Sequence, residues 1–205
     1  MPDHGRQPPA PPVPSAPGSL RWVEEFINTR SVESAADEIA APALLAGWLR
    51  HRDLLPAGVL VSIDEHHRAL RMREGLRALV AANNTVPGTA DHARGGSRPG
   101  RGLSGSALAE VAGLSRRLPL VLDVASRPPR LRPLYRGTAD SVLALMLAAV
   151  AESVASGTWN RLKACKDPGC RWAYYDQSRN RSRAWCSMAA CGNRAKARAF
   201  RDRAR

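Results

Sequence analysis

The sequence predicts a mainly α-helical fold: a helical N-terminal domain with one β-hairpin, followed by a small C-terminal α+β module. Three observations predict it. Apolar residues recur at helical spacing in several stretches between residues 20 and 156. Two short apolar runs on either side of a proline-rich turn interrupt the helical pattern. All four cysteines lie after residue 160, in a stretch too short for a large core of its own.

Residues 1–18 are predicted to be a disordered leader, because they contain seven prolines and little apolar surface to bury. A proline-rich docking peptide is the alternative interpretation of this leader. The leader has no apolar segment of the signal-peptide type, and no stretch of the chain is apolar for the length of a bilayer. We therefore expect a cytoplasmic protein with no membrane partner.

The ordered domain is expected over residues 19–157, and its first half predicts three helices. Helical spacing of apolar residues predicts a helix over 20–30, and Pro42 is suited to open the next one. Ser62 followed by Glu65 is a capping box, which predicts a long helix to about Ala82. Four arginines of this helix are expected mostly on its wet side: Arg68, Arg71, Arg73 and Arg77.

The second half of this domain predicts a loop, a hairpin and a strong helix. The glycine-rich basic run 94–102 is interpreted as a solvated loop, with RNA contact as the alternative. A short helix follows near 104–114, and the runs 119–124 and 131–135 predict a β-hairpin. Thr138 is expected to cap a helix that ends at Gly157 and buries an apolar stripe. That stripe consists of Val142, Leu143, Met146, Leu147, Val150 and Val154.

The C-terminal module, residues 158–205, has its cysteines in two C-x4-C pairs separated by fifteen residues. Pairs with this spacing let one short loop supply two ligands to a tetrahedral ion. None of the histidines (His4, His51, His66, His67 and His92) lies in the module. The pattern therefore predicts one structural Zn²⁺ held by Cys165, Cys170, Cys186 and Cys191. Chelation is expected to unfold the module and to spare the N-terminal helices.

The module also carries most of the positive charge of the chain. The formal net charge is +13, and residues 160–205 contain 13 Lys and Arg against 3 acidic residues. Beyond Cys191 the chain reads as a helix with arginines on one face, while Ala197, Phe200 and Ala204 form a face that can pack on the module. We predict nucleic-acid contacts, the basic loop included, from Arg179, Arg181, Arg183, Arg194, Lys196, Arg198 and Arg201.

Other basic residues of the module have two open interpretations. Lys163, Lys166 and Arg171 either offset the negative charge of four thiolates on one Zn²⁺ or add to the nucleic-acid surface. Nothing in the chain predicts an enzyme, because it has no P-loop, dinucleotide-binding glycine motif, nucleophile elbow or His-Glu-x-x-His motif. His66 and His67 are interpreted as surface or half-buried residues.

Several motifs of the C-terminal module resemble the CGNR zinc-finger family. They are the two cysteine pairs, the run Tyr175-Asp176-x-Ser178-Arg179-Asn180, Trp185-Cys186, and Cys191-Gly192-Asn193-Arg194. The N-terminal part is similar to the ABATE domain at 26–29, 44–49 and 73–77. The resemblance implies a bacterial, stress-induced transcription regulator that binds DNA through its zinc finger.

Three functional hypotheses follow for this chain. The first is a regulator on duplex DNA, associated with the nucleoid, whose helical domain forms a homodimer or senses a small-molecule effector. The second is an RNA-binding protein that stacks bases on Trp172, Tyr174 and Tyr175, although these aromatics are better suited to the small core of the module. The third is a protein-interaction module whose basic face meets an acidic partner.

Overall fold

The computed structural model describes residues 15–84 and 101–203. This part of the chain contains six α-helices and two antiparallel two-stranded sheets, which confirms the mainly α fold class. The helices are α1 Leu20–Asn28, α2 Pro42–Arg50, α3 Ile63–Ala82, α4 Arg101–Ser115, α5 Ala139–Ala155 and α6 Asn193–Arg203. The strands are β1 Leu120–Asp123, β2 Arg130–Pro133, β3 Leu162–Ala164 and β4 Ala173–Tyr175. A 3₁₀ turn (Trp159–Arg161) and a π-helical turn (Met188–Gly192) complete the C-terminal module.

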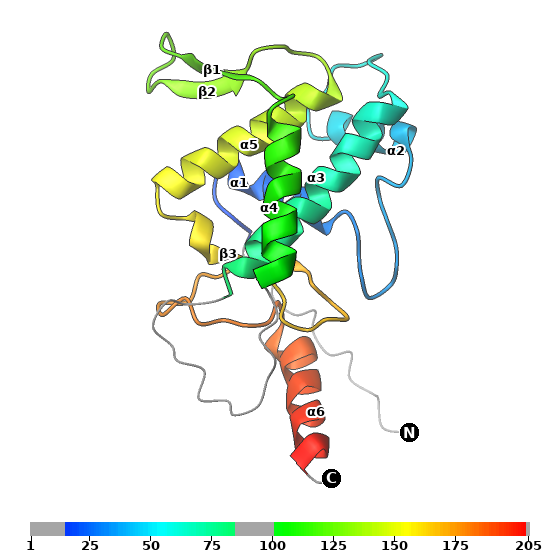
Figure 1. Ribbon diagram of the computed structural model, residues 1–205, viewed down its shortest axis with the longest axis vertical. Helices are drawn as coiled ribbons and strands as arrows, with labels where there is room; N and C mark the ends of the chain where they lie inside the picture. The colour runs from blue at the N-terminus through cyan, green and yellow to red at the C-terminus, as the bar shows by residue number, and fades with distance from the viewer. Residues whose placement is uncertain (1–14, 85–100, 204–205) are drawn as a thin grey trace, which may run out of the picture.

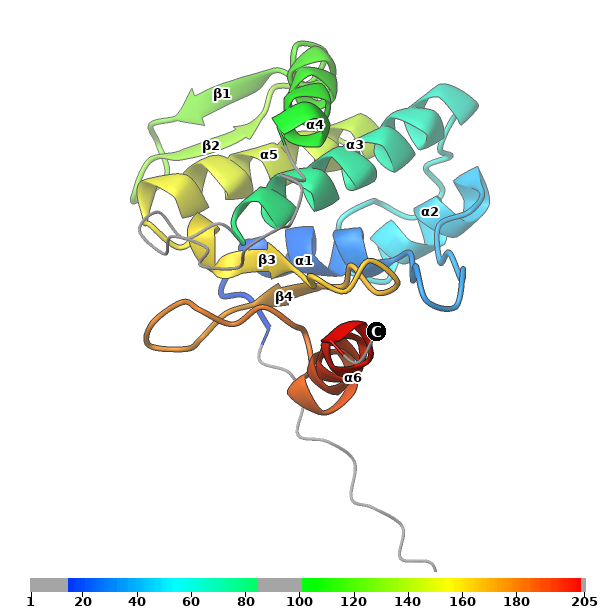
Figure 2. The ribbon, with the colours of Figure 1, turned by 60° about the horizontal axis from the view of Figure 1, so that its bottom comes forward.

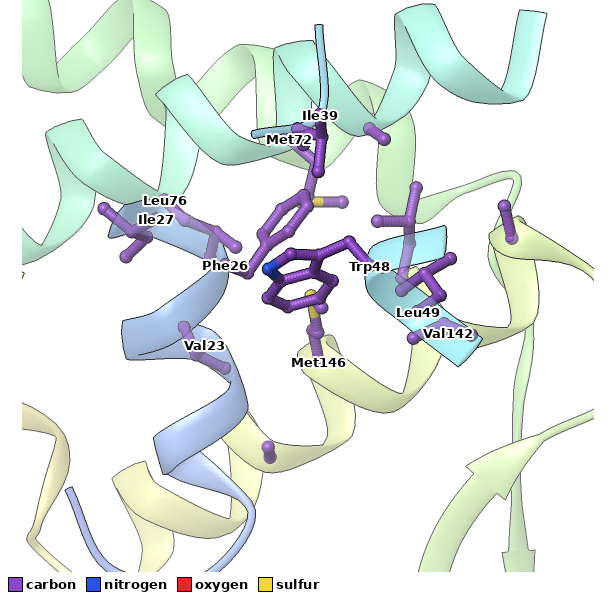
Figure 3. Packing of buried hydrophobic residues seen from close by; sticks show 14 of the residues in the cluster. Val23, Phe26, Ile27, Ile39, Trp48, Leu49, Met72, Leu76, Val142 and Met146 are labelled. Carbon is purple, nitrogen blue, oxygen red and sulfur yellow. The ribbon is translucent and has the colours of Figure 1, made fainter. Parts of the chain in front are cut away.

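The helices pack around α3, which contacts α1, α2, α4, α5 and strand β3. Figure 1 shows the β1–β2 hairpin at one end of the molecule and α6 projecting from the other. The centre of the core is formed by Phe26 and Trp48, whose ring centroids are 5.9 Å apart, together with Met72 and Met146 (Figure 3). Within the described residues, no helix is long and apolar enough to cross a membrane.

The predicted helix starts are confirmed at both capping boxes. The Ser62 hydroxyl accepts a hydrogen bond from the Glu65 amide at 3.2 Å, and Thr138 accepts one from the Ser141 amide at 3.1 Å. The buried stripe of α5 is shorter than expected, because Val154 is 58% exposed near the end of the helix. The hairpin pairs Leu120 with Pro133 and Asp123 with Arg130.

Parts of two sequence expectations lie outside the described residues. These are residues 1–14 of the expected leader and 94–100 of the basic glycine-rich run, whose last two residues begin α4. Within the rest of the leader, Ala16 is buried and its amide donates to the Glu24 carboxylate at 2.6 Å. Contacts with α1 therefore begin ahead of Ser19.

The arginines of α3 do not all lie on its wet side, as the sequence had indicated. Arg71 is exposed and Arg68 half-buried, but Arg73 is 2% exposed and Arg77 is fully buried. Arg73 forms a two-point ion pair with Asp37 at 2.7 and 2.8 Å. Arg77 donates to the main-chain carbonyls of Ile27, Arg30 and Arg171. The expectation was wrong because acceptors from distant segments, which helical periodicity does not reveal, compensate the burial of both side chains.

His66 is also more buried than expected, at 6% exposure, whereas His67 is exposed as predicted. The His66 Nε2 atom donates to the carbonyl of Ile39 at 2.8 Å. This bond joins α3 to the segment that leads into α2. His66 is therefore a buried polar residue, and this hydrogen bond satisfies its ring nitrogen.

The second sheet joins the C-terminal module to the helical domain. Leu162, Ala164, Ala173 and Tyr175 of β3 and β4 belong to the same core cluster as α1, α3 and α5. Asn28 extends this sheet with its side chain, donating to the Ala173 carbonyl at 2.9 Å and accepting from the Ala173 amide at 2.8 Å. Figure 2 shows β3 and β4 lying directly against α1. The module therefore shares its apolar packing with the helices.

Gly75 permits the close contact between α3 and α4. A Cβ atom at this position would lie 2.6 Å from Cγ2 of the buried Val111. We expect Gly75→Ala to lower the free energy of unfolding by about 1–3 kcal/mol, because the overpacking outweighs the gain of about 1 kcal/mol in helix propensity. Urea denaturation of the purified protein measures the change.

Gly47→Ala is the matched control for this prediction. Gly47 lies inside α2 and is exposed, and a Cβ atom added there would have no other atom within 4 Å. This substitution should stabilise the protein by up to about 1 kcal/mol. Equal stabilisation by both substitutions would contradict the tight α3–α4 contact.

Candidate metal centre

The four cysteines come from two turns, one between β3 and β4 and the other just before α6, whose sulfurs lie close together. Cys165 directly follows β3, and its amide donates to the Trp172 carbonyl at 2.8 Å. Cys170 ends the turn through Pro168 and Gly169 that the dipeptide predicted. Cys186 precedes the π-helical turn that contains Cys191. These local turns place thiols from both pairs at one point.

Gly192 lies where the second turn closes. A Cβ atom there would lie 2.5 Å from the sulfur of Met188, one turn earlier in the same π-helical segment. The Gly192 amide donates to the Ser187 carbonyl at 3.0 Å and so closes this turn around Cys191. Met188 is a flexible side chain at 50% exposure, so this contact alone does not demand a glycine next to the ligand.

The geometry of the four sulfurs fits a tetrahedral zinc ion. All four lie within 4.8 Å of one another. The Cys170–Cys186 and Cys186–Cys191 sulfur pairs are 3.5 and 3.7 Å apart. Zn–S bonds of about 2.3 Å in a tetrahedron place sulfurs about 3.8 Å apart. Three of the cysteines are buried and Cys186 is half-buried, so the site is a closed structural centre for one Zn²⁺ held by four thiolates.

The thiols interact strongly with one another. Hydrogen bonds with Cys170 and then Cys186 lower the pKa of the Cys165 thiol to about 2, whereas the hydrogen bonds of Cys186 with Cys165 and then Cys170 raise the pKa of Cys186. One proton-free sulfur is thus favoured at the expense of its neighbours. Zn²⁺ removes this competition, because it stabilises the thiolate form of all its cysteine ligands.

Arg194 brings a positive charge into contact with the cysteine cluster. Its Nη2 atom donates to the Cys191 sulfur at 3.0 Å, its Nε to Asp167 at 3.0 Å, and its Nη1 to Glu33 at 2.6 Å. Pairing with Glu33 and then Asp167 raises the pKa of Arg194, so the guanidinium stays charged. Lys163, Lys166 and Arg171 had been candidates for offsetting the thiolate charge, and the contact with a ligand sulfur comes instead from this arginine.

Asp167 organises the basic residues at the start of α6. It is 3% exposed and is also 3.3 Å from Nη2 of Arg198. Burial alone would raise the pKa of Asp167, but the bond from the Gly169 amide and the pairing with Arg194 and Arg198 outweigh burial, and the pKa is lowered. The carboxylate thus remains ionised and ties the first turn of α6 to the Cys165–Cys170 turn.

A second buried ion pair fixes the basic loop between the two cysteine pairs. Lys163 and Asp176 are 2.9 Å apart and at most 2% exposed. Lys163 also donates to the carbonyls of Arg181 and Arg183, and the Arg183 amide donates to Asp176 at 3.0 Å. Burial alone would raise the pKa of Asp176, but the hydrogen bonds from Lys163 and Ser178 outweigh burial, so the pKa lies below its usual value. The pair therefore holds a loop that has little apolar packing.

Sequence reasoning missed the acidic members of these networks. Asp176 did carry a signal, because Asp followed by Ser two residues later is typical of an Asx turn, and the Ser178 amide and hydroxyl both donate to it. Asp167 precedes Pro-Gly in the turn between Cys165 and Cys170, which is a weaker signal of the same kind. Glu33 lies in the helical domain, so no local pattern connects it with Arg194.

The structure divides the predicted nucleic-acid residues into two groups. Arg183, Arg194 and Arg198 are engaged within the molecule, and Arg183 lies over the Tyr174 ring at 4.9 Å while donating to main-chain carbonyls. Arg179, Arg181, Lys196 and Arg201 are exposed, and none of them has an ion-pair partner among residues 15–84 and 101–203. The exposed group lies on the loop and on α6.

The faces of α6 are used differently from the prediction. The arginine face at 194 and 198 meets the zinc module through Asp167, whereas Phe200 is 70% exposed and α6 has no buried residue. The prediction of an apolar packing face was wrong. Burial of two alanines and one phenylalanine stabilises the helix position less than pairing of arginines with a buried carboxylate and a thiolate, which both need cations. Ala204 lies outside the described residues.

The aromatic residues of the module separate in the same way. Tyr174 is fully buried and donates from its hydroxyl to the Arg183 carbonyl at 2.7 Å, and Tyr175 is 7% exposed. Trp185 packs against the cysteine cluster. Trp172, at 39% exposure, remains on the surface. Tyr174 and Trp185 thus serve the core around the cysteines, whereas Tyr175 packs into the core of the helical domain.

Taken together, the fold and the site define a protein with a helical domain and a four-cysteine zinc finger fused to it. Residues 161–204 match the CGNR zinc finger, and residues 20–157 match the ABATE domain, described as "Putative stress-induced transcription regulator". The chain therefore belongs to the ABATE family and carries a CGNR zinc finger at its C-terminus, which confirms the resemblance found in the sequence. No curated protein matches the chain.

Proposed function

We propose that this protein is a DNA-binding transcription regulator that meets the duplex with α6 and the loop 177–183. The zinc finger then has a non-catalytic role, and the protein acts in the cytoplasm, associated with the nucleoid. The zinc centre supports the scaffold and takes no part in a reaction. The helical domain then serves as the regulatory or dimerising part.

The main support is the position and surface of α6. The helix projects from the body (Figures 1 and 2), has no buried residue, and contains one acidic residue, Asp202, in its sequence. An α-helix of this kind fits the major groove, and unpaired Arg and Lys side chains can contact phosphates or bases. Arg194 and Arg198 would fix the angle of the helix through Asp167.

The loop 177–183 supports the same surface. The Lys163–Asp176 pair is hydrogen-bonded to the backbone of this loop. The exposed Arg179 and Arg181 therefore lie on an ordered segment. A loop that is already ordered loses less conformational entropy on binding than a free one. Exposed Trp172 is the observation that favours single-stranded RNA instead, since an aromatic face stacks on any base.

We expect the double substitution Lys196→Ala and Arg201→Ala in the full-length protein to weaken binding to random duplex DNA. The slope of log K against log salt should become less steep by about 2, because two phosphate contacts are lost. Fluorescence anisotropy between about 50 and 200 mM salt measures the slope. Alanine suits a helix, so the fold should not change.

The control is Arg116→Ala with Arg117→Ala, two exposed arginines that follow α4 in the helical domain. This variant removes the same charge and should leave the slope unchanged. An equal effect of both double variants would mean general polycation behaviour. Tighter binding to single-stranded RNA than to duplex at equal salt would favour the RNA-binding alternative.

A further inference from the structure

The helical domain contains an open cavity of about 570 Å³ to which neither family description assigns a role. Its walls are the end of α2 with the turn that follows, strand β2 with the loop after it, and the first turns of α5. The hairpin and α6 lie at opposite ends of the molecule, so this cavity is remote from the basic helix (Figure 1). Its volume is in the range of cavities that take small organic ligands.

The cavity combines an apolar floor with three guanidinium groups. The floor includes Leu54, Leu55, Pro133 and Leu145. The charged side chains of the lining are Arg50, Arg132 and Arg136 against the single carboxylate of Asp53. A concave apolar surface with an excess of positive charge favours a ligand that has an apolar body and an anionic group.

Two of the three guanidinium groups lack partners within the described part of the chain. Arg50 and Arg136 are exposed, and they have neither an ion pair nor a side-chain hydrogen bond there. Arg132 forms an ion pair with Asp123, whose carboxylate oxygen lies 3.4 Å from the Arg132 Nε atom. This buried Nε atom has no hydrogen bond, so the ion pair satisfies the guanidinium only in part.

A neighbouring cavity provides the contrast. It has a volume of about 310 Å³, shares Pro133 and Ser141 with the first, and contains Arg68. There Asp140 neutralises Arg68 through two hydrogen bonds of 2.8 and 2.9 Å, and Glu65 balances the charge of Arg117 in the lining. Of these two cavities, the larger one therefore has the excess of positive charge.

We propose that the larger cavity binds a small organic carboxylate, with its apolar body on the leucine floor and its carboxylate between Arg132 and Arg136. Guanidinium groups pair with carboxylates through two parallel hydrogen bonds, which gives this class an advantage over a neutral molecule of the same shape. Arg50 adds charge from the opposite wall. Binding at this site does not depend on the DNA-binding proposal, and its test uses no nucleic acid.

The test titrates the full-length, zinc-loaded protein with 2-naphthoate by isothermal calorimetry, beside 2-naphthamide as the neutral isostere and inorganic phosphate. We expect saturable 1:1 binding of the naphthoate, and binding of the naphthamide weaker by about tenfold or more. Arg132→Gln and Arg136→Gln should each weaken naphthoate binding by a similar factor. Thermal unfolding of Arg136→Gln should match the parent, because this exposed side chain makes no described contact.

Arg130→Gln is the matched control, because Arg130 is exposed on the same strand and does not line the cavity. It should leave naphthoate binding unchanged. The proposal is overturned if the naphthoate does not bind, if the naphthamide binds equally well, or if Arg130→Gln weakens binding as much as Arg136→Gln. Phosphate binding as tight as that of the naphthoate, with the same arginine dependence, would also overturn it, since the site would then select charge alone.

Discussion

Removing the zinc ion should unfold the second cysteine pair, the loop 177–183 and α6, while α1, α3 and α5 stay folded. Elemental analysis should give one zinc per chain, and Cys170→Ser should abolish it. Structural zinc sites contribute about 10–16 kcal/mol of binding free energy, and the segment after Asp176 has little apolar packing to replace that contribution. Hydrogen exchange read by mass spectrometry, with and without a strong chelator, locates the loss.

The β3–β4 sheet should behave differently from the rest of the module. Its apolar residues pack into the main core and Asn28 bonds to Ala173, so its amides should remain protected without zinc. Ser182→Ala, an exposed change in the basic loop, is the control and should keep one zinc per chain. Unprotected amides in α3 after chelation, or no change in α6, would contradict the expected division.

Arg77→Met should lower the free energy of unfolding by about 3–5 kcal/mol. The side chain is fully buried and donates to three main-chain carbonyls, of Ile27 at 2.6 Å and of Arg30 and Arg171 at 3.1 Å. Burial lowers the pKa of Arg77, partly offset by the charge of Glu74. Methionine fills similar space but leaves all three carbonyls without this donor, and each buried acceptor lost costs about 1–3 kcal/mol.

Arg71→Met is the matched control for this second prediction. Arg71 lies on the same helix but is exposed, and its ion pair with Glu110 is 3.4 Å long. A surface pair of this kind contributes about 0–1 kcal/mol. Urea denaturation of both variants gives the comparison. Equal losses would mean that the Arg77 carbonyl contacts carry little of the stability.

The parts of the fold that follow local rules could be predicted from the sequence. The capping box at Ser62, the cap residue Thr138 and the proline at position 42 placed three helix starts correctly. The cysteine spacing predicted a four-thiolate site, because ligand pairs in short turns are a local property. The hairpin followed from two apolar runs around a proline-rich turn.

The parts that depend on distant partners could not be predicted. Arg73 and Arg77 are buried because Asp37 and several carbonyls from other segments accept their hydrogen bonds. The orientation of α6 depends on Asp167, in the turn between Cys165 and Cys170, which pairs with Arg194 after the second cysteine pair. In both cases charge was read as a sign of exposure, whereas an ionic partner elsewhere in the chain made burial or internal pairing favourable.

The hydrogen bonds from the helical domain to β3 and β4 have one further consequence. Asn28, Asn83 and Asn84 each bond to the main chain of β3, β4 or the turn before them, and Arg77 bonds to the Arg171 carbonyl between two ligands. The zinc finger is thus not an independent unit on a linker, because it is hydrogen-bonded to the helical domain at several points. A substitution at Asn83 or Asn84, which contacts no cysteine, can therefore shift the strand that leads into Cys165.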